Sequence, residues 1–200
     1  MNFLLQLLVV MAVACTVSGF QLTSQVASSR SLLSMLKVGD VAPDFTLTNY
    51  AGKSFKLSQF KGKKPVVVFF YPADNSPGCK EEVCAFEKRA PDFKTAGAEV
   101  FGISSGGAAD KEKFVRANSL ASMELLIDDK DGVRKSWAVP KALFGVFPGR
   151  VTYVLGKDGS VKSVYDDLAN AKLHPDKALL ALAADKASEP APKKKSFGLF

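Results

Sequence analysis

The strongest constraint on the fold is a continuous apolar run, PVVVFFY, at residues 65–71. A strand that faces water on one side alternates polar and apolar residues, whereas a run without alternation is typical of a strand covered on both faces. A sheet is covered on both faces when other layers of structure pack on each side of it. We therefore expect this run to be a central strand of an α/β sheet.

The segments around this run follow alternating strand and helix patterns. Residues 44–49 and 54–57 alternate with period two around a glycine turn and predict a β-hairpin. Apolar residues recur at helical spacing over residues 78–96, and Pro91 is expected to kink or split that helix. Further strands are predicted at 98–104, 125–128, 151–155 and 160–165, and further helices at 108–118, 131–137 and 175–184. This order predicts a three-layer α/β/α sandwich with an N-terminal β-hairpin.

The N-terminal part differs in composition from the rest of the chain. An apolar run from Leu4 to Cys15, followed by small residues, predicts a signal peptide over residues 1–19. Residues 20–36 are serine-rich, basic and free of acidic residues, as in an organelle transit peptide. Together the two segments resemble the bipartite presequences of algae whose plastids lie inside additional membranes. They predict a plastid protein, and the alternative is a secreted protein with a serine-rich N-terminus.

The globular domain is predicted at residues 37–186. Residues 187–200 are rich in Pro, Ala and Lys and predict a disordered basic tail. The three lysines at 193–195 and a few apolar residues allow at most weak contact with an anionic membrane surface.

The composition excludes two classes of function. The net charge is +7, from 27 basic and 20 acidic residues, but part of the excess lies outside the predicted domain. The sequence has no basic stripe with interleaved aromatic residues, so we expect no nucleic-acid binding. Three cysteines and one histidine cannot supply the usual four ligands of a structural zinc site, so we expect no metal.

Two cysteines follow the apolar strand, and they are the only ones left if the signal peptide is removed: Cys79 and Cys84. An ordinary thiol has a pKa of about 8.5 and is mostly protonated at neutral pH. A helix N-terminus favours the thiolate, because its free N–H groups and aligned peptide dipoles attract an anion. Pro77-Gly78 can start such a helix, and Ser76 can cap it or contact the sulfur. Arg150, at the entrance of a strand, is a candidate cation for the same site.

The spacing of the two cysteines argues against a permanent disulfide. In an ideal helix, residues five positions apart have Cα atoms roughly 8.6 Å apart. A disulfide needs Cα atoms within about 7 Å of each other. Cys79 and Cys84 therefore cannot bridge while the helix is intact, which favours a reaction cycle that unwinds and refolds this segment. The alternative is that Cys84 is simply a small helix residue outside the apolar stripe.

The residues around the first cysteine resemble a known family. The pattern Pro72-x-x-x-Ser76-x-x-Cys79 resembles the active-site signature of the peroxiredoxins. The wider motif with Cys84 is similar to their peroxiredoxin Q group, also called bacterioferritin comigratory proteins. The likeness continues in the stretches 39–45, 96–104, 133–140 and 143–154, and it covers residues 37–184.

This resemblance implies a thioredoxin-like fold and a thiol-dependent peroxidase that reduces hydrogen peroxide and organic hydroperoxides. Cys79 would be the peroxidatic cysteine, which becomes a sulfenic acid, and Cys84 would resolve it as an intramolecular disulfide. Ser76 would orient the peroxide, Pro72 would shield the site from water, and Arg150 would stabilise the thiolate and polarise the leaving oxygen. The implied reductant is thioredoxin or a similar dithiol protein. No bound cofactor is required, and an intrachain resolving cysteine favours a monomer.

Two other functions fit parts of the pattern. A thioredoxin-like protein disulfide oxidoreductase would share the fold, but its two cysteines are usually separated by two residues, whereas four intervene here. A non-catalytic binding module would make the cysteine pair incidental. The combination of Pro72, Ser76, Cys79 and Arg150 argues against that alternative.

Overall fold

The computed structural model describes residues 34–74 and 76–188. The signal peptide predicted at residues 1–19, most of the transit-like segment and the predicted tail from residue 189 lie outside these ranges. The folded part extends slightly beyond the predicted 37–186 at both ends. Met35 and Leu36 pack against the hydrophobic core. The last helix, α5 (His174–Ser188), continues two residues past the predicted boundary, since no helix-breaking proline occurs before Pro190.

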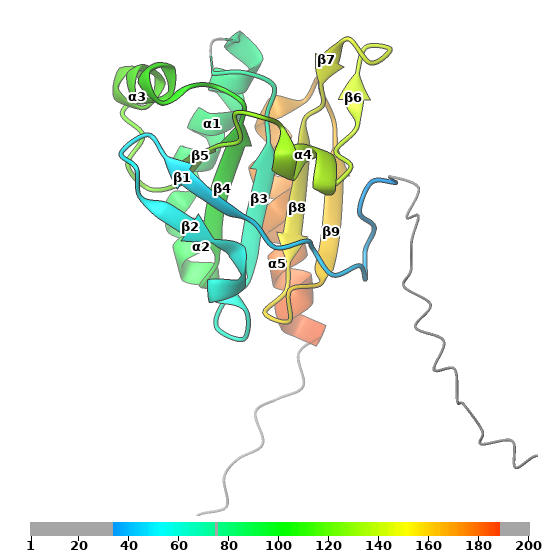
Figure 1. Ribbon diagram of the computed structural model, residues 1–200. Helices are drawn as coiled ribbons and strands as arrows, with labels where there is room; N and C mark the ends of the chain where they lie inside the picture. The colour runs from blue at the N-terminus through cyan, green and yellow to red at the C-terminus, as the bar shows by residue number, and fades with distance from the viewer. Residues whose placement is uncertain (1–33, 75, 189–200) are drawn as a thin grey trace, which may run out of the picture. The chain divides into compact units, whose positions relative to one another are not determined.

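A seven-stranded sheet with the order β2-β1-β5-β4-β3-β8-β9 forms the centre of the fold (Figure 1). The apolar run forms β3 (Val66–Phe70), which is buried along its whole length. It is parallel to β4 (Glu99–Ser104) on one side and antiparallel to β8 (Val151–Leu155) on the other. The remaining strands of the sheet are β1 (Thr46–Asn49), β2 (Ser54–Lys56), β5 (Glu124–Ile127) and β9 (Val161–Asp166). β1 and β2 pair as the predicted hairpin.

The sheet separates two hydrophobic cores, because successive side chains of a strand point to opposite faces. Val67 and Phe69 of β3 face a core shared with α1, α2, α3 and α5. Val66, Val68 and Phe70 face a second core together with residues of α4 and its C-terminal flank. Figure 1 shows α1, α2 and α5 behind the sheet and α4 in front of it. The helices other than α5 are α1 (Pro77–Lys88), α2 (Ala90–Ala96), α3 (Ala108–Ala117) and α4 (Gly132–Ser136). The predicted three-layer α/β/α class is confirmed.

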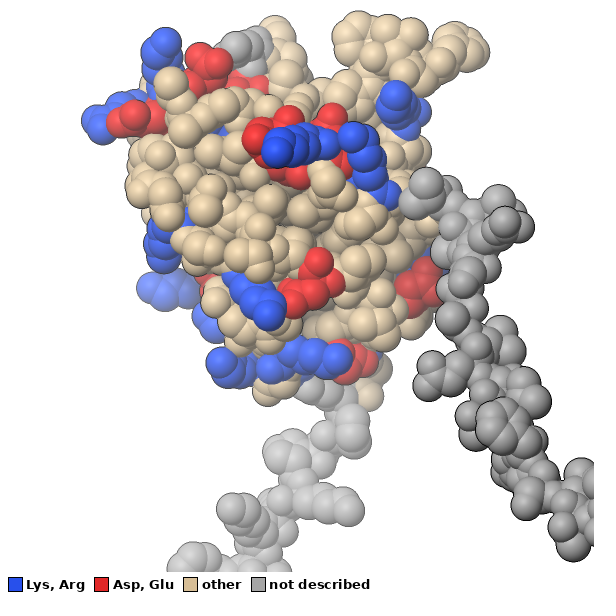
Figure 2. Space-filling view, viewed as in Figure 1, with Lys and Arg blue, Asp and Glu red and all other residues tan. Residues whose placement is uncertain are grey.

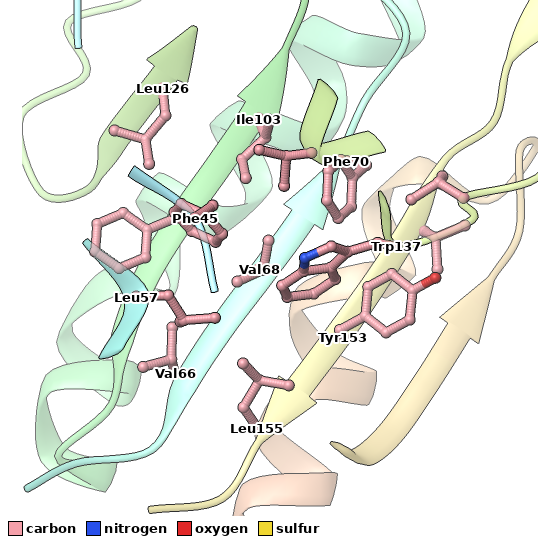
Figure 3. Close-up of a cluster of buried hydrophobic side chains, with 14 of the residues drawn as sticks. Phe45, Leu57, Val66, Val68, Phe70, Ile103, Leu126, Trp137, Tyr153 and Leu155 are labelled. Carbon is pink, nitrogen blue, oxygen red and sulfur yellow. The ribbon is translucent and has the colours of Figure 1, made fainter. Parts of the chain in front are cut away.

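The core in front of the sheet is rich in aromatic rings (Figure 3). The Trp137 ring packs edge-on against Tyr153 and Phe70, with ring centroids 5.2 and 5.4 Å apart. Its indole nitrogen donates to the carbonyl of Pro43 at 3.1 Å, which ties the segment before β1 to this core. Ring pairs of this kind contribute about 0.5–1.5 kcal/mol each beyond their buried area. These contacts fix α4 over β3, the strand that leads into the cysteine motif.

The helix predicted at residues 78–96 is split, as Pro91 suggested. α1 ends at Lys88 and α2 begins at Ala90, so that the proline lies in the first turn of α2. Proline is tolerated there because the first N–H groups of a helix have no partner within it. The elements that were not predicted are short: the 3₁₀ helices η1 (Leu57–Phe60) and η2 (Ala171–Leu173) and the hairpin of β6 (Lys141–Ala142) and β7 (Phe147–Pro148).

The surface of the domain carries mixed charge. On the face drawn in Figure 2, basic and acidic side chains lie interspersed, and the projecting tip of the β6–β7 hairpin is uncharged. This tip exposes Leu143, Phe144, Val146 and Phe147. Within residues 34–74 and 76–188, no helix is long and apolar enough to cross a membrane. No group of three or more His, Cys, Asp or Glu side chains in these same ranges could hold a metal ion.

Candidate active site

The turn after β3 places Cys79 in the first turn of α1. Ser76 is the N-cap of this helix, and Pro77 occupies the first helical position. The Ser76 hydroxyl oxygen accepts a hydrogen bond from the backbone N–H of Cys79 at 3.2 Å. Ser and Pro are favoured at these two positions, because one supplies an acceptor for a free N–H and the other lacks an N–H. Cys79 therefore sits where the helix N-terminus favours a negative charge.

Arg150 supplies a cation to the same site. Its Nη2 lies 3.6 Å from the Cys79 sulfur, and both side chains are buried. The two residues meet because Phe70, at the end of β3, pairs with Val151 at the start of β8. The Arg150 Nε also donates to the carbonyl of Leu168 at 3.2 Å, which fixes the direction of the guanidinium group. A thiolate that is shielded from water needs such a positive partner, because burial alone disfavours its charge.

The helix approaches Arg150 closely at Gly78, the residue before the cysteine. A Cβ atom at Gly78 would lie 3.3 Å from Arg150 Nη2, which is tighter than an ordinary contact. A side chain at this position would therefore require a small shift of the guanidinium group or of the helix.

A buried carboxylate contacts the other side of the guanidinium group. Glu82 has no exposed surface, and its Oε2 accepts a hydrogen bond from Arg150 Nη1. Burial raises the pKa of Glu82 to about 8, although Arg150 and, more weakly, Arg134 oppose this shift. Glu82 was not singled out by the sequence analysis. It stands three residues after Cys79 and four before Phe86, on the buried face of α1, but this spacing alone does not distinguish a buried charge from a solvated one.

A second buried arginine, Arg134 of α4, braces the backbone of the site. Its Nη1 donates to the carbonyl of Gly149 and its Nη2 to the carbonyl of Tyr71, both at 2.9 Å. Gly149 directly precedes Arg150, and Tyr71 directly precedes Pro72, so one side chain joins the two segments that carry the site. Burial lowers the pKa of Arg134, but a guanidinium group stays charged at neutral pH.

A buried ion pair anchors the turn between β3 and α1. Lys111 of α3 and Asp74 of the turn have almost no exposed surface, and Lys111 Nζ lies 3.0 Å from Asp74 Oδ1. Lys111 Nζ also donates to the hydroxyl groups of Ser104 at 2.6 Å and Tyr71 at 3.0 Å. The Tyr71 hydroxyl donates to Asp74 Oδ1 at 2.6 Å. This network holds the turn two residues before the Ser76 cap.

Cys84 lies on the same helix as Cys79, and both thiols are free. It is half-buried, packs against the core behind the sheet, and has its sulfur 4.0 Å from Asn118 Oδ1. It also lines a surface hollow of about 510 Å³ together with three lysines, Lys80, Lys88 and Lys172. α1 is continuous from Pro77 to Lys88, so both cysteines lie within one intact helix. At this spacing their Cα atoms are too far apart for a disulfide.

The structure thus brings Ser76 and Arg150 into contact with Cys79. Pro72 is half-buried in the segment between β3 and α1, and Cys84 lies farther along α1. No sequence pattern singled out Glu82, Arg134 or the Lys111–Asp74 pair. The same holds for a buried histidine, His174, whose Nδ1 lies 3.5 Å from Glu82 Oε1. No local pattern marks this histidine, because its contact with α1 arises only when α5 packs against that helix.

Comparison with known proteins assigns the chain to a family. The sequence profile of the AhpC/TSA family matches residues 38–164. A chloroplastic peroxiredoxin Q of Sedum lineare is 43% identical over 165 residues, which cover 82% of this chain and 88% of that protein. The chain belongs to the peroxiredoxin Q group of this family. A chloroplastic peroxiredoxin Q of Suaeda salsa is 45% identical over 149 residues, covering 74% of this chain and 69% of that protein.

Solved structures of peroxiredoxins share the fold. The crystal structure of peroxidoxin BcpB from Mycobacterium tuberculosis matches with a TM-score of 0.68 and 34% identity, covering 74% of this chain and 97% of that one. A Xanthomonas campestris bacterioferritin comigratory protein, studied for its alkyl peroxide reduction activity, matches with a TM-score of 0.64 and 26% identity. The match covers 74% of this chain and 96% of that one. The predicted thioredoxin-like fold is therefore confirmed, and as a peroxiredoxin this chain is a thiol-dependent peroxidase.

Proposed function

We propose that this peroxiredoxin reduces hydrogen peroxide and organic hydroperoxides at Cys79, with Cys84 as the resolving cysteine and thioredoxin or a similar dithiol protein as reductant. The observation that carries the proposal is the position of the Cys79 sulfur. It lies in the first turn of α1, buried, and 3.6 Å from the guanidinium group of Arg150. A helix N-terminus and a cation together favour the thiolate, which is the nucleophile that a peroxidase of this kind requires.

In the first step, the Cys79 thiolate attacks the terminal oxygen of the peroxide ROOH. A sulfur–oxygen bond forms and the oxygen–oxygen bond breaks, so that the sulfur is oxidised to a sulfenic acid. The leaving RO⁻ takes a proton and departs as ROH. Arg150 stabilises the charge that grows on this oxygen. The Ser76 hydroxyl oxygen already accepts from the Cys79 N–H, so its own hydrogen is free to donate to the peroxide.

In the second step, the Cys84 sulfur attacks the Cys79 sulfenic acid, which releases water and leaves a disulfide. The two residues are five apart in a continuous helix, where their Cα atoms would be roughly 8.6 Å apart. The first turns of α1 must therefore unwind before the bond can form. A dithiol protein then returns two electrons and two protons, which restores both thiols and allows α1 to refold.

The remaining features of the proposal concern the cell. Because the resolving cysteine is in the same chain, the cycle needs no second subunit, and we assign a monomer. The relatives named above are chloroplastic, which supports a plastid location reached through the presequence predicted at residues 1–36. Secretion is the alternative. A fluorescent fusion of the full-length chain would separate the two, since plastid import and secretion give different images.

Rapid mixing of the reduced protein with hydrogen peroxide tests the assignment of the two cysteines. The wild type should lose thiolate far faster than free cysteine does, and Cys79→Ser should abolish this phase. Cys84→Ser should keep the first turnover but lose recycling by thioredoxin. Sustained thioredoxin-dependent turnover of Cys84→Ser would show that Cys84 does not resolve the sulfenic acid. A fast phase that survives in Cys79→Ser would remove Cys79 from the reaction.

A further inference from the structure

A single buried histidine begins α5, on the face of the sheet that α1 also covers (Figure 1). The Nε2 of His174 lies 2.8 Å from the carbonyl oxygen of Asp167, and its Nδ1 lies 2.7 Å from the hydroxyl of Thr152. A carbonyl oxygen can only accept a hydrogen bond, so Nε2 carries the hydrogen. In the neutral ring, Nδ1 is then an acceptor with one lone pair, and the Thr152 hydroxyl donates to it. Nδ1 points toward the buried side of α1.

The carboxyl group of Glu82 also faces this unprotonated nitrogen. Its Oε2 is bound to Arg150, but Oε1 has no hydrogen-bond partner among the described residues. Oε1 lies 3.5 Å from His174 Nδ1, and both side chains have no exposed surface. A buried carboxylate oxygen without a donor is costly. Nδ1 faces Oε1 at 3.5 Å without a hydrogen of its own, so it cannot stabilise an ionised carboxylate, and a neutral, protonated Oε1 is favoured there.

The two groups together hold one proton at neutral pH. Burial raises the pKa of Glu82 to about 8, and burial lowers the pKa of His174 to about 4. The proton therefore belongs to Glu82, and the neutral His174 faces it with the unprotonated Nδ1 at 3.5 Å. Whether Glu82 is neutral or ionised decides how strongly Arg150 can stabilise a negative charge on the Cys79 sulfur.

We propose that His174 is a positioning residue for the peroxidase reaction: by keeping a proton on Glu82, it leaves the charge of Arg150 available to the Cys79 thiolate. This inference rests on the proposed role of Cys79. When the proton is present, the thiolate and Arg150 form a neutral buried pair. When it is lost, Arg150 is shared between two anions, Cys79 and Glu82, and the repulsion of the carboxylate disfavours the thiolate.

The other groups around the pair keep their charge near neutral pH. Hydrogen bonds from Asn170 lower the pKa of Asp167 to about 2, and burial raises the pKa of Tyr165. The charged or titratable groups that face Glu82 and His174 are Cys79 of α1, Arg134 of α4, Arg150 before β8, Tyr165 of β9 and Asp167 after β9. Of these, only Cys79 changes charge in the reaction.

The substitution His174→Gln tests the inference. The glutamine amide reaches the position of Nε2 and can still donate to Asp167, but it has no base at the position of Nδ1. The rate of the peroxide reaction, measured against pH in the reduced protein, should shift to a more alkaline midpoint by about one pH unit, as the loss of a nearby neutralising proton implies. A purely structural role would lower the rate without moving the midpoint.

The matched background is Glu82→Gln, which imitates the protonated carboxyl group permanently. Its midpoint should lie at or below that of the wild type, and adding His174→Gln to it should cause no further shift. A wild-type midpoint in folded His174→Gln, or an equal shift in the Glu82→Gln background, would overturn the inference. The proposed function fails differently: the wild type would then react no faster than free cysteine at any pH.

If His174→Gln does not fold, the histidine ring of the protein that retains His174 can be measured instead. Since the chain contains one histidine, ¹⁵N-labelled histidine reports on His174 alone. The spectrum should show the hydrogen on Nε2. The coupling between two sites is reciprocal, so the Cys79 thiolate must raise the affinity of Glu82 for its proton. The Nδ1 signal should therefore titrate at lower pH in Cys79→Ser than in the wild type, and identical curves in the two proteins would refute the coupling.

Discussion

The buried pair of Lys111 and Asp74 allows a quantitative prediction about the turn that carries the active site. Lys111→Met removes the ammonium group and leaves Asp74 with hydrogen bonds from the hydroxyls of Tyr71 and Ser104 alone. Removal of one partner of a buried ion pair typically costs about 3–5 kcal/mol, because the other charge stays buried. The two remaining donors place this case at the lower end, about 3 kcal/mol. In a chain of this size, such a loss lowers Tm by roughly 6–12 °C.

Urea unfolding of the reduced protein, followed by circular dichroism, measures this loss. Lys113→Met is the matched control, because Lys113 is an exposed residue on the same helix, and its cost should be within about 0.5 kcal/mol. Combining Lys111→Met with Asp74→Asn should cost less than the sum of the single changes, since the second substitution removes the stranded charge. The reasoning fails if Lys111→Met costs no more than Lys113→Met, or if the two effects simply add.

Three further predictions concern the reaction itself. Arg150→Lys should lower the peroxide rate constant by about 10²–10³, because an ammonium group cannot bind both Glu82 and the sulfur as the guanidinium group does; rapid mixing with peroxide measures this, and a loss below tenfold would contradict it. Oxidation should increase amide exchange in the N-terminal half of α1, because a Cys79–Cys84 disulfide requires unwinding; equal protection in both redox states would refute the cycle. The folded-state pKa of Glu82 is raised from 4.5 to about 8, so the folded form binds more protons than the unfolded form between these values, and stability should fall as pH rises through this window. Unfolding curves of the wild type and Glu82→Gln should differ in this slope, and parallel curves would contradict the assignment.

The start of α1 was predictable because the chemistry of a helix N-terminus is local. Ser76 and Pro77 stand next to the positions that they serve, and their side chains act on N–H groups within three residues. The contact between Arg150 and Cys79 has another origin. It depends on the register of β3 with β8, which joins residues 71 positions apart. The sequence indicated only that Arg150 stands at a strand end, and the family resemblance supplied the rest.

Glu82 and His174 mark the limit of local patterns. A charged residue among apolar ones is usually solvated. The helical spacing of Glu82 therefore predicts its burial only once the position of Arg150 is known. Glu82 and Arg150 are 68 positions apart in the sequence. His174 meets Glu82 because α5 returns to the sheet beside α1, and this depends on the packing of the whole domain. The buried polar groups were therefore the hardest to predict, although the apolar spacing located the surrounding core.

The packing around Cys79 links the chemical step to the conformational one. The sulfur has no exposed surface, and protein interiors are too closely packed to accept an added oxygen atom without movement. Oxidation also removes the negative charge from the sulfur and with it the attraction to Arg150. Both effects weaken the contacts that hold the first turns of α1, while the oxidised form gains nothing from the helix N-terminus. In the proposed cycle, the oxidation of Cys79 itself therefore favours the unwinding through which Cys84 reaches it.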